Sequence, residues 1–411
     1  PLMAGGALLV GLDVGVNETR AVVARAREAR NGGGEPLRIL GVGVARTEGM
    51  TRATVTNLEA TTESIRESIQ AAELMAGHEV ERAYVGVAGV HAHVARSRGV
   101  VAVSGAEVHA SHLRQVEEVG RAVAIPPDRE LIHALCQEYA VDGRGGIEDP
   151  IGMTATRLES DVCLVTADST ACRDLRRAVD RAGYRPAELV LEPLASSLAV
   201  LRDAEREAEV ALVEMGAANT DVVVFHGRRV RYMRSLPWGA NTVTRDIARG
   251  LGVPEDEAAR LKDRHGAARR ADVDAAERLE LSGPSGGPAR DIARDLLAHI
   301  IEQRMDEIFG LVYEQLDDAG LLDRLGAGVV LTGEGVSLPG TVELARSVFN
   351  LPVRLGEPGG SLIGMADAVR RTRFSTSVGL ALYGSMRAPR GRFSGAGRLA
   401  GRLSRWLKDF F

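Results

Sequence analysis

The sequence predicts an α/β protein of two related lobes with a small additional subdomain. A strand–turn–strand unit opens the chain in ALLVGLDVGVNETRAVVARAR. A second unit of the same design, EVALVEMGAANTDVVVFHGRRVRYMRSL, follows roughly two hundred residues later, which indicates a duplication. Strands and helices alternate between the two units, from residue 161 onward, as they do in an α/β layer.

The first lobe is expected over 8–83 and 161–208 (subdomain 1A). Its hairpin is followed by a third β-run, LRILGVGVAR, and by TTESIRESIQAAELMAG, whose apolar spacing predicts a helix that ends at Gly77. From 84 to 160 the chain changes to short β-runs, the helical HASHLRQVEEVGRAV and the loop DGRGGIEDPIG, which predict an inserted α+β subdomain (1C). The lobe resumes with SDVCLVTAD, STACRDLRRAVDRAG, AELVLE and PLASSLAVLRDAE, read as strand, helix, strand and helix.

The second lobe is expected over 209–240 and 301–386 (2A), with a subdomain 2B over 241–300. A helical stretch at 241–266 precedes the loop LSGPSGGPAR, and RDIARDLLAHIIEQRMDEIFGLVYEQLDDAG predicts one long helix. The strand GVVLTGEG and a helix around STSVGLALYG close the fold. Residues 387–397 are predicted to be a linker and 398–411 an amphipathic helix.

Composition narrows the classes of function. A net charge of −5 over 411 residues argues against a globally basic nucleic-acid binder, so we expect no nucleic-acid partner. The three cysteines, Cys136, Cys163 and Cys172, lack metal-ligand spacing and predict free thiols, the alternative being a disulfide or metal role. No basic-then-apolar leader and no run of about 18 apolar residues is present, so we expect neither secretion nor a spanning helix.

Both hairpins carry an acid and a glycine to their turn. These are Asp13 and Gly15 in the first and Glu214 and Gly216 in the second. Consecutive turn amides can cradle phosphates, and nearby carboxylates can hold Mg²⁺ through water. The alternative for either turn alone is a tight turn with no ligand. A third element, VVLTGEGVSLPG, ends a buried strand in a Gly-rich turn, where Gly333 and Gly335 are expected to let a flat base approach the backbone.

The last residues, RLAGRLSRWLKDFF, have the pattern of a helix that lies in a membrane surface. One face is apolar and the other basic, and the residues concerned are Leu399, Leu403, Trp406, Leu407, Phe410 and Phe411 against Arg398, Arg402, Arg405 and Lys408. Each basic residue gains roughly 1 kcal/mol beside anionic lipid. The alternative is a helix docked on this chain's own core or on another chain. Because ordering the tail offsets much of the gain, one tail should bind only marginally, and polymerisation would strengthen attachment.

The three turns together resemble the two phosphate motifs and the adenosine motif of the actin and heat-shock-chaperone ATPase superfamily. In LVLEPLASSLAV, Glu192 resembles that superfamily's water-orienting acid, a possible catalytic residue. Longer blocks, VTNLEATTESIRESIQAAELMAG and AVAIPPDRELIHALCQEYAVDGRGGIEDPIGM among them, resemble the FtsA family over about residues 8 to 385. FtsA proteins are actin-related bacterial division proteins that anchor the tubulin-like protein FtsZ to the membrane.

The resemblance implies an actin-like (ribonuclease H-like, duplicated) two-lobed fold with a displaced small subdomain. It also implies a filament-forming adaptor at the cytoplasmic face of the cell membrane, at the division site. In the block GPARDIARDLLAHIIEQRMDEIF, Arg290, Arg304 and Glu307 match the family's contacts with the FtsZ C-terminal peptide. Without the resemblance, Arg304 and Glu307 would be read as a solvated surface pair.

The nucleotide motifs depart from the family pattern. The first turn carries Val16 and Glu18 where a hydroxyl and a lysine are usual, and the second carries Ala217 and Ala218 in place of glycines. The ribose motif has Ala259 where a carboxylate is usual. Asp13, Glu192, Asp221, Lys262 and the Gly333/Gly335 turn are retained. The expected cofactor-binding residues are Asp13 (also the Mg²⁺ candidate), Gly15, Asn17, Glu214, Gly216, Asn219, Asp221, Lys262, Gly333 and Gly335.

These substitutions predict weakened binding of ATP and Mg²⁺ and little hydrolysis, because a negative charge replaces a phosphate-binding cation and two amides lose glycine's freedom. Two alternatives stay open. One is an active ATPase or kinase of the same superfold, and the other is a membrane tether of a pilus or secretion system, because fold alone does not separate functions.

Overall fold

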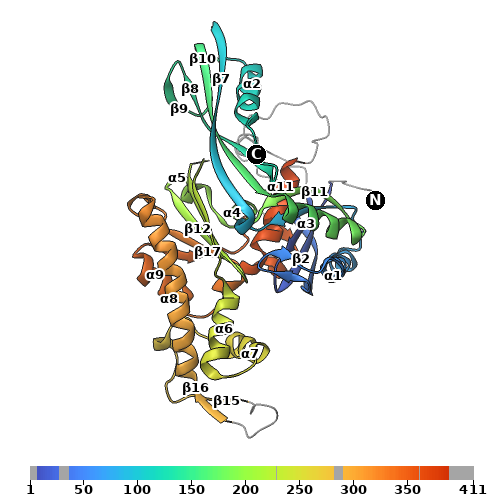
Figure 1. The fold of residues 1–411 in the computed structure, drawn as a ribbon, viewed down its shortest axis with the longest axis vertical. Helices are drawn as coiled ribbons and strands as arrows, with labels where there is room; N and C mark the ends of the chain where they lie inside the picture. Colours follow the sequence, from blue (N-terminus) through green and yellow to red (C-terminus); the bar gives the residue numbers. More distant parts are fainter. Residues whose placement is uncertain (1–6, 27–36, 228, 282–289, 361, 388–411) are drawn as a thin grey trace.

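The computed structural model describes residues 7–26, 37–227, 229–281, 290–360 and 362–387. The chain forms two α/β lobes side by side, and each carries an arm that extends along the long axis of the molecule (Figure 1). The arm of lobe 1 is the inserted subdomain, and the arm of lobe 2 is subdomain 2B. The two-lobed α/β fold predicted from the sequence is confirmed.

Lobe 1 is built on a six-stranded sheet. Its strands, in sheet order, are β11 (Arg185–Leu191), β6 (Arg82–Val87), β1 (Leu8–Val14), β2 (Glu18–Ala26), β3 (Leu37–Arg46) and β19 (Leu362–Gly364). β1, β2 and β3 run antiparallel, whereas β6 is parallel to β1. Helices α1 (Leu58–Ala76) and α3 (Ser169–Arg181) pack on one face. The Asn57 side chain caps α1 at its start, and Gly77, with φ of 66°, ends it as predicted.

Lobe 2 repeats this plan with five strands. In sheet order they are β14 (Arg229–Leu236), β13 (Thr220–His226), β12 (Val210–Met215), β17 (Val329–Thr332) and β18 (Val353–Leu355). The hairpin is antiparallel and β17 is parallel to β12, so strand order and direction match those of lobe 1. Helices α8 (Arg294–Asp318) and α9 (Thr341–Phe349) bury the apolar face of this sheet. The duplication predicted from the two hairpins is confirmed.

Two helices lie between the lobes. These are α4 (Glu192–Val200) and α11 (Ser375–Arg387), and they share one apolar core with strands of both sheets. The sequence-based assignment of 301–386 to lobe 2 is wrong at its end, because β19 pairs with β3 and α11 packs on β1 and β2 of lobe 1. Gly11 makes this packing possible, since a Cβ there would lie 1.9 Å from the Ser377 carbonyl oxygen.

The inserted subdomain is a four-stranded sheet covered by one helix. Its elements are β7 (Ala92–Glu107), β10 (Thr154–Asp168), β8 (Arg129–Val141), β9 (Arg144–Ile147) and α2 (Ala110–Arg121). The expected limits, 84–160, need correction at both ends. β6 belongs to the lobe 1 sheet, and β10 continues as one strand to Asp168, where its carboxylate caps α3. The subdomain is therefore joined to lobe 1 by continuous strands.

Subdomain 2B contains α6 (Ala240–Leu251), α7 (Glu255–His265), β15 (Arg278–Leu281), β16 (Arg290–Ala293) and the start of α8. The expected helical stretch at 241–266 is two helices, because Gly252 adopts a left-handed conformation (φ 61°) and Pro254 follows it. Residues 290–293 are a strand, paired with β15, and not the start of the long helix. Short elements complete the fold, namely β4 (Met50–Thr51), β5 (Thr54–Val55), α5 (Asp203–Glu207) and α10 (Ala366–Val369).

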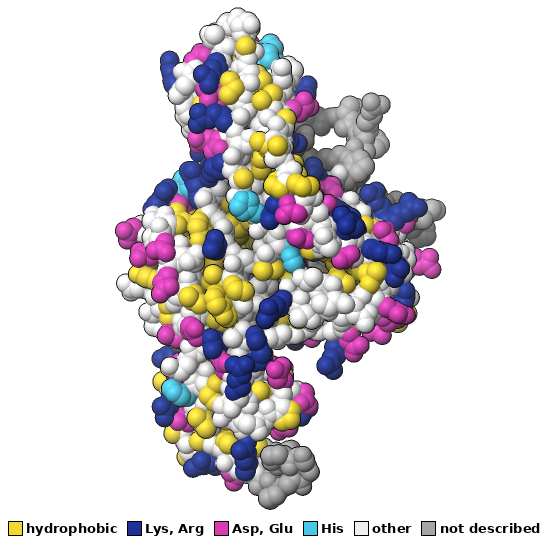
Figure 2. Space-filling view, viewed as in Figure 1, with side chains coloured by type: hydrophobic (Ala, Val, Ile, Leu, Met, Phe, Trp, Pro, Cys, Tyr) yellow, Lys and Arg dark blue, Asp and Glu magenta, His cyan; other side chains and the backbone are white. Residues whose placement is uncertain are grey.

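The visible surface carries charges of both signs, and the three cysteines form no disulfide. Figure 2 shows basic and acidic side chains interspersed, with no broad surface of one sign on the visible face. Cys136, Cys163 and Cys172 are free thiols, the last two buried. Among the residues that the structure describes, no helix is both long and apolar enough to cross a membrane.

Candidate functional site

The two hairpin turns face each other across the junction of the lobes, and β17 ends beside them. They enclose a cavity of only about 60 Å³. Eight of the predicted site residues line it, namely Asp13, Gly15, Glu192, Glu214, Gly216, Asn219, Asp221 and Gly333. Strand ends that are far apart in sequence meet here because both lobes use the same strand order, which places equivalent turns at equivalent edges.

The turn amides expected to bind phosphate are used inside the turns. The Gly15 amide donates to the Glu18 carbonyl oxygen at 3.2 Å, and the Gly216 amide donates to the Asn219 carbonyl oxygen at 2.9 Å. A Cβ at Gly15 would lie 2.8 Å from that Glu18 oxygen, so this glycine is required by the turn itself. In this conformation both turns are closed by their own backbone.

A guanidinium that the sequence reasoning missed lies in the cavity wall. Arg20 stands opposite Asp13 in the β1–β2 register, and its side chain is 6% exposed. Its Nη1 donates to Asp13 Oδ2 at 3.3 Å, and its Nη2 donates to Glu18 Oε2 at 2.9 Å and to the Glu334 carboxylate. Glu334 belongs to the short 3₁₀ helix η5 (Glu334–Val336) of lobe 2, so this contact joins the two lobes.

A second polar contact crosses between the lobes beside the first. The Asn17 side-chain amide donates to Asn241 Oδ1 at 2.9 Å and to Glu334 Oε1 at 3.0 Å. Asn241 donates back to Asn17 Oδ1 at 2.9 Å. Asn17, predicted as a nucleotide contact, is thus engaged with α6 and with the turn after β17.

Burial is the largest influence on the pKa values of the acids in this site. It raises the pKa of Asp13 to about 6, against the lowering effect of Arg20 and together with the repulsion of Glu334. Burial likewise raises the pKa of Asp221 to about 6 and that of Glu214 to about 7, although hydroxyl groups of Ser196 and Thr376 donate to Glu214 at 2.6 and 2.7 Å. These carboxyls gain protons more readily than ordinary acids do.

Glu192, the candidate water-orienting acid, starts α4 and lines the cavity. Burial, and then the charges of Asp13 and Glu214, raise its pKa well above the ordinary value. A raised carboxyl pKa is the direction in which enzymes adjust a glutamate that exchanges protons near neutral pH. Glu192 lies in the cavity, and its role in orienting water stays a prediction.

Gly333 and Gly335, the glycines expected to admit a flat base, are both required by local packing. A Cβ at Gly333, where φ is +93°, would lie 2.4 Å from the Met215 carbonyl oxygen, and a Cβ at Gly335 would lie 2.5 Å from Met215 Cγ. Their missing side chains make room for the end of β12. Lys262, expected at the ribose, donates to Thr244 Oγ1 at 2.9 Å between α7 and α6, and it is not among the residues that line the cavity.

The residues present do not fit an ATP molecule in this conformation. Ligand pockets commonly enclose about 300–1,000 Å³, whereas this cavity holds about 60 Å³. Three carboxylates, those of Asp13, Glu18 and Glu334, surround the Arg20 guanidinium, so its charge is already matched. Within the described part of the chain, no cluster of three or more His, Cys, Asp or Glu side chains is placed to hold a metal ion.

The predicted partner residues lie on or beside 2B and are bonded within the chain. Arg290, on β16, donates to the Leu251 carbonyl oxygen at the end of α6. Arg304 and Glu307 form an ion pair of 2.5 Å on α8, and Arg304 also contacts Asp246 of α6. The Arg304 side chain keeps 22% of its surface exposed and that of Glu307 56%. The ten predicted membrane residues of 398–411, and almost all of the linker, lie outside the described residues.

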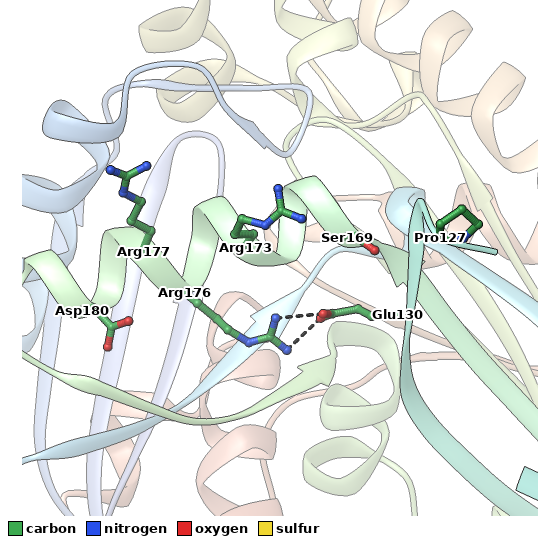
Figure 3. Close-up of a pocket in the computed structure, with 7 residues that line it drawn as sticks. All are labelled: Pro127, Glu130, Ser169, Arg173, Arg176, Arg177 and Asp180. Carbon is green, nitrogen blue, oxygen red and sulfur yellow. Dashed lines mark hydrogen bonds and ion pairs between the residues drawn. The ribbon is translucent and has the colours of Figure 1, made fainter. Parts of the chain in front are cut away.

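A larger hollow lies where the inserted subdomain meets lobe 1 (Figure 3). It encloses about 450 Å³ and is lined by Pro127, Glu130, Ser169, Arg173, Arg176, Arg177 and Asp180. Arg176 pairs with Glu130 through two contacts of 2.7 and 3.0 Å, while Arg173 and Arg177 point away from that pair. The pair connects α3 to β8 and so helps to seat the subdomain on the lobe.

Duplicated lobes whose hairpin turns face each other define the actin-like fold. The PilM–PilN type IV pilus biogenesis complex has a TM-score of 0.64 at 15% identity, covering 93% of this chain and 99% of that chain. MreB5 of Spiroplasma citri bound to ADP has a TM-score of 0.55 at 11% identity (92% and 95% covered). The MamK double helical filament has a TM-score of 0.50 at 10% identity (92% and 98% covered).

Sequence comparison identifies the family. The profile described as "Cell division protein FtsA" matches residues 211–379, and that described as "SHS2 domain inserted in FTSA" matches residues 89–166. Cell division protein FtsA of Pseudomonas aeruginosa is 37% identical over 379 residues, covering 92% of this chain and 89% of that protein. The Neisseria meningitidis protein is 33% identical over 410 residues, covering 97% and 98%. The chain belongs to the FtsA family of cell-division proteins, as the sequence blocks predicted.

Proposed function

We propose that this chain is a membrane adaptor of cell division, which attaches the FtsZ ring to the cytoplasmic face of the membrane at the division site. The observation that carries this proposal is membership in the FtsA family over more than nine-tenths of the chain, inserted subdomain included. The basic and apolar faces of 398–411 supply the attachment. The nucleotide site is weakened, and the protein associates with itself into filaments, an assembly named for the MamK protein of the same fold.

The membrane step is tested by co-sedimentation with anionic liposomes at low and moderate salt. We expect the full chain to pellet and a chain that ends at Ala388 to stay in solution, with salt weakening the binding because part of it is electrostatic. A matched control replaces Trp406 and Phe410 with serine in the full chain, which removes apolar burial but keeps every charge. Equal sedimentation of the full and shortened chains would mean that the tail docks on protein, and would refute the anchor.

For FtsZ binding, we propose that Arg290 and Arg304 contact the acidic, partly apolar C-terminal peptide of FtsZ, with Glu307 at the edge of the surface. Fluorescence anisotropy with a labelled peptide measures the affinity. Arg304→Ala should lower it by roughly ten- to a hundredfold, the effect of losing a charge-assisted hydrogen bond of about 1.5–3 kcal/mol.

Asp246→Ala is the matched control for this surface. It breaks the same contact between α6 and α8 but leaves the Arg304 guanidinium in place, still paired with Glu307. If Arg304 meets the peptide directly, affinity should be kept or increased in this variant. If both variants weaken binding equally, the arginine acts only by holding the two helices together, and the proposed contact is refuted.

The nucleotide step is measured on the purified full chain. MreB5 of the same fold has been solved with ADP and with AMPPNP, so the superfold can accommodate a nucleotide. Here the small cavity and the acidic turn support weak ATP binding and little turnover. Tight Mg²⁺-dependent binding with steady phosphate release would favour the active ATPase or kinase, the alternative function, over the adaptor with a degenerate site.

A further inference from the structure

We propose that the chain closes its two lobes with its own side chains, in the cleft between the two hairpin turns where the sequence motifs predicted a nucleotide. The contacts form an interlobe latch, defined here as Asn17, Arg20, Asn241 and Glu334. The closed arrangement of the lobes then needs no ATP. This inference goes beyond the proposed adaptor function and does not depend on the tail or on FtsZ.

The ionic part of the latch is fixed from both sides. Arg20 belongs to β2 of lobe 1, where Asp13 and Glu18 hold its guanidinium through Nη1, Nε and Nη2. The remaining direction of Nη2 meets Glu334, which lies 314 residues further along the chain in lobe 2. Because the guanidinium is already positioned by its own lobe, little side-chain entropy is lost when the lobes meet. The Glu334 side chain is 18% exposed, so salt screens this contact only partly.

The amide part of the latch is reciprocal. Asn17 and Asn241 exchange two hydrogen bonds of 2.9 Å, and Asn17 also donates to Glu334 at 3.0 Å. Asn241 lies in the first turn of α6, whose start is itself fixed, because the Ala240 amide donates to the Gly216 carbonyl oxygen at 2.9 Å. The latch therefore connects the β1–β2 turn of lobe 1 to two turns of lobe 2, which are the β12–β13 turn and the turn after β17.

The latch and a polyphosphate chain compete for the same place. A phosphate between the two hairpin turns would have to displace the Arg20–Glu334 pair, and it would then face the freed Glu334 carboxylate. Like charges brought together in a partly desolvated site repel strongly. Replacing the family's lysine by Glu18 and placing Glu334 after Gly333 thus act in the same direction, since both add negative charge where phosphate charge would lie.

Hydrogen–deuterium exchange on the full chain tests the proposal. The segments to follow are 13–20 in lobe 1 and 332–337 in lobe 2, with and without ATP and Mg²⁺. The variant is Glu334→Gln, which keeps the shape of the side chain and removes its charge. The matched control is Glu343→Gln, an exposed acid on α9 of the same lobe.

We expect Glu334→Gln to raise exchange about tenfold in both segments, with the control unchanged. Exchange of the wild-type segments should be the same with and without ATP and Mg²⁺. Asn241→Ala removes the two hydrogen bonds between Asn17 and Asn241 and should also lower protection in both lobes. It carries the test if Glu334→Gln does not fold.

Two results would overturn the proposal. One is wild-type exchange that slows in both segments on addition of ATP and Mg²⁺, because the nucleotide and not the latch would then bridge the lobes. The other is a folded Glu334→Gln protein with wild-type exchange in both segments. Failure of the tail or peptide experiments would leave this test unaffected, since the latch lies entirely within residues 17–334.

Discussion

The replacement of Arg20 by methionine tests the electrostatics of the interlobe site most directly. Methionine fills much of the same volume but leaves the carboxylates of Asp13, Glu18 and Glu334 without their guanidinium. Removing one partner of a buried ion pair costs about 3–5 kcal/mol. Glu18 adds little, because its side chain is 34% exposed and exposed pairs are worth about 0–1 kcal/mol. We therefore expect the free energy of unfolding to fall by roughly 3–5 kcal/mol near pH 8.

The pH dependence gives this prediction a distinct signature. In the wild type the pKa of Asp13 is raised by burial to about 6, and Arg20 lowers it from a still higher position. Without Arg20 the folded-state pKa rises further, while the unfolded value stays near 3.9. Between these values the folded protein keeps a proton that the unfolded chain loses, so stability falls as pH rises. The difference between variant and wild type should therefore shrink as the pH is lowered toward about 5.

Urea unfolding followed by far-UV circular dichroism, at a series of pH values, measures both effects. Arg177→Met is the control, because Arg177 is an exposed arginine of the same lobe that lies on α3. The reasoning is refuted if Arg20→Met costs no more than the control near pH 8. It is also refuted if the cost does not depend on pH, because the acids would then be too well solvated to feel the missing charge.

Three further predictions use the same unfolding assay. In the wild type the raised pKa of Glu214 should lower the free energy of unfolding as pH rises from about 4.5 to 7, by about 1.4 kcal/mol for each pKa unit. Glu214→Gln should remove this pH dependence, and an unchanged dependence on pH would contradict a buried acid at this position. Gly11→Ala should destabilise the fold by at least about 1–3 kcal/mol, since its Cβ would meet the Ser377 carbonyl oxygen. Gly310→Ala, at an open position of α8 with an ordinary helical backbone, is the comparison for added bulk. Arg176→Ala should lower the free energy of unfolding by no more than about 1 kcal/mol, because its ion pair with Glu130 is partly exposed. A larger loss would mean that this pair is the main contact that holds the inserted subdomain against lobe 1.

The sequence was sufficient for the fold because both lobes repeat a hairpin pattern that burial imposes. Asp13 and Glu214 could be placed in one site for the same reason, since equivalent strand ends in duplicated sheets meet at one edge. Arg20 was readable in principle, because a β1–β2 hairpin of this turn length puts it opposite Asp13. Glu334 was not readable, since its contact with Arg20 depends on how two lobes approach each other.

The helix α11 shows a second limit of sequence reasoning. Its buried residues predict a helix correctly, yet nothing in their spacing says which sheet they cover. The structure answers through Gly11 and Gly379, where backbones approach too closely for a Cβ and fix α11 against β1 and α4. The assignment of this helix to a lobe therefore depends on close approaches at single glycines, one in β1 and one in α11 itself, and not on the apolar spacing.

If side chains and not a nucleotide hold the two lobes together, nucleotide hydrolysis cannot supply the reversible step in membrane attachment by the proposed adaptor. Where a nucleotide bridges two lobes, its hydrolysis can loosen them. The Arg20–Glu334 pair offers no such step, because it joins two side chains of the protein itself and no reaction consumes it. Control of attachment then falls to contacts outside the cleft, which are the marginal binding of each tail to lipid and the number of tails that one filament presents. Such an adaptor would respond to filament length and to the supply of FtsZ, and changing the ATP concentration should leave its membrane binding unaltered.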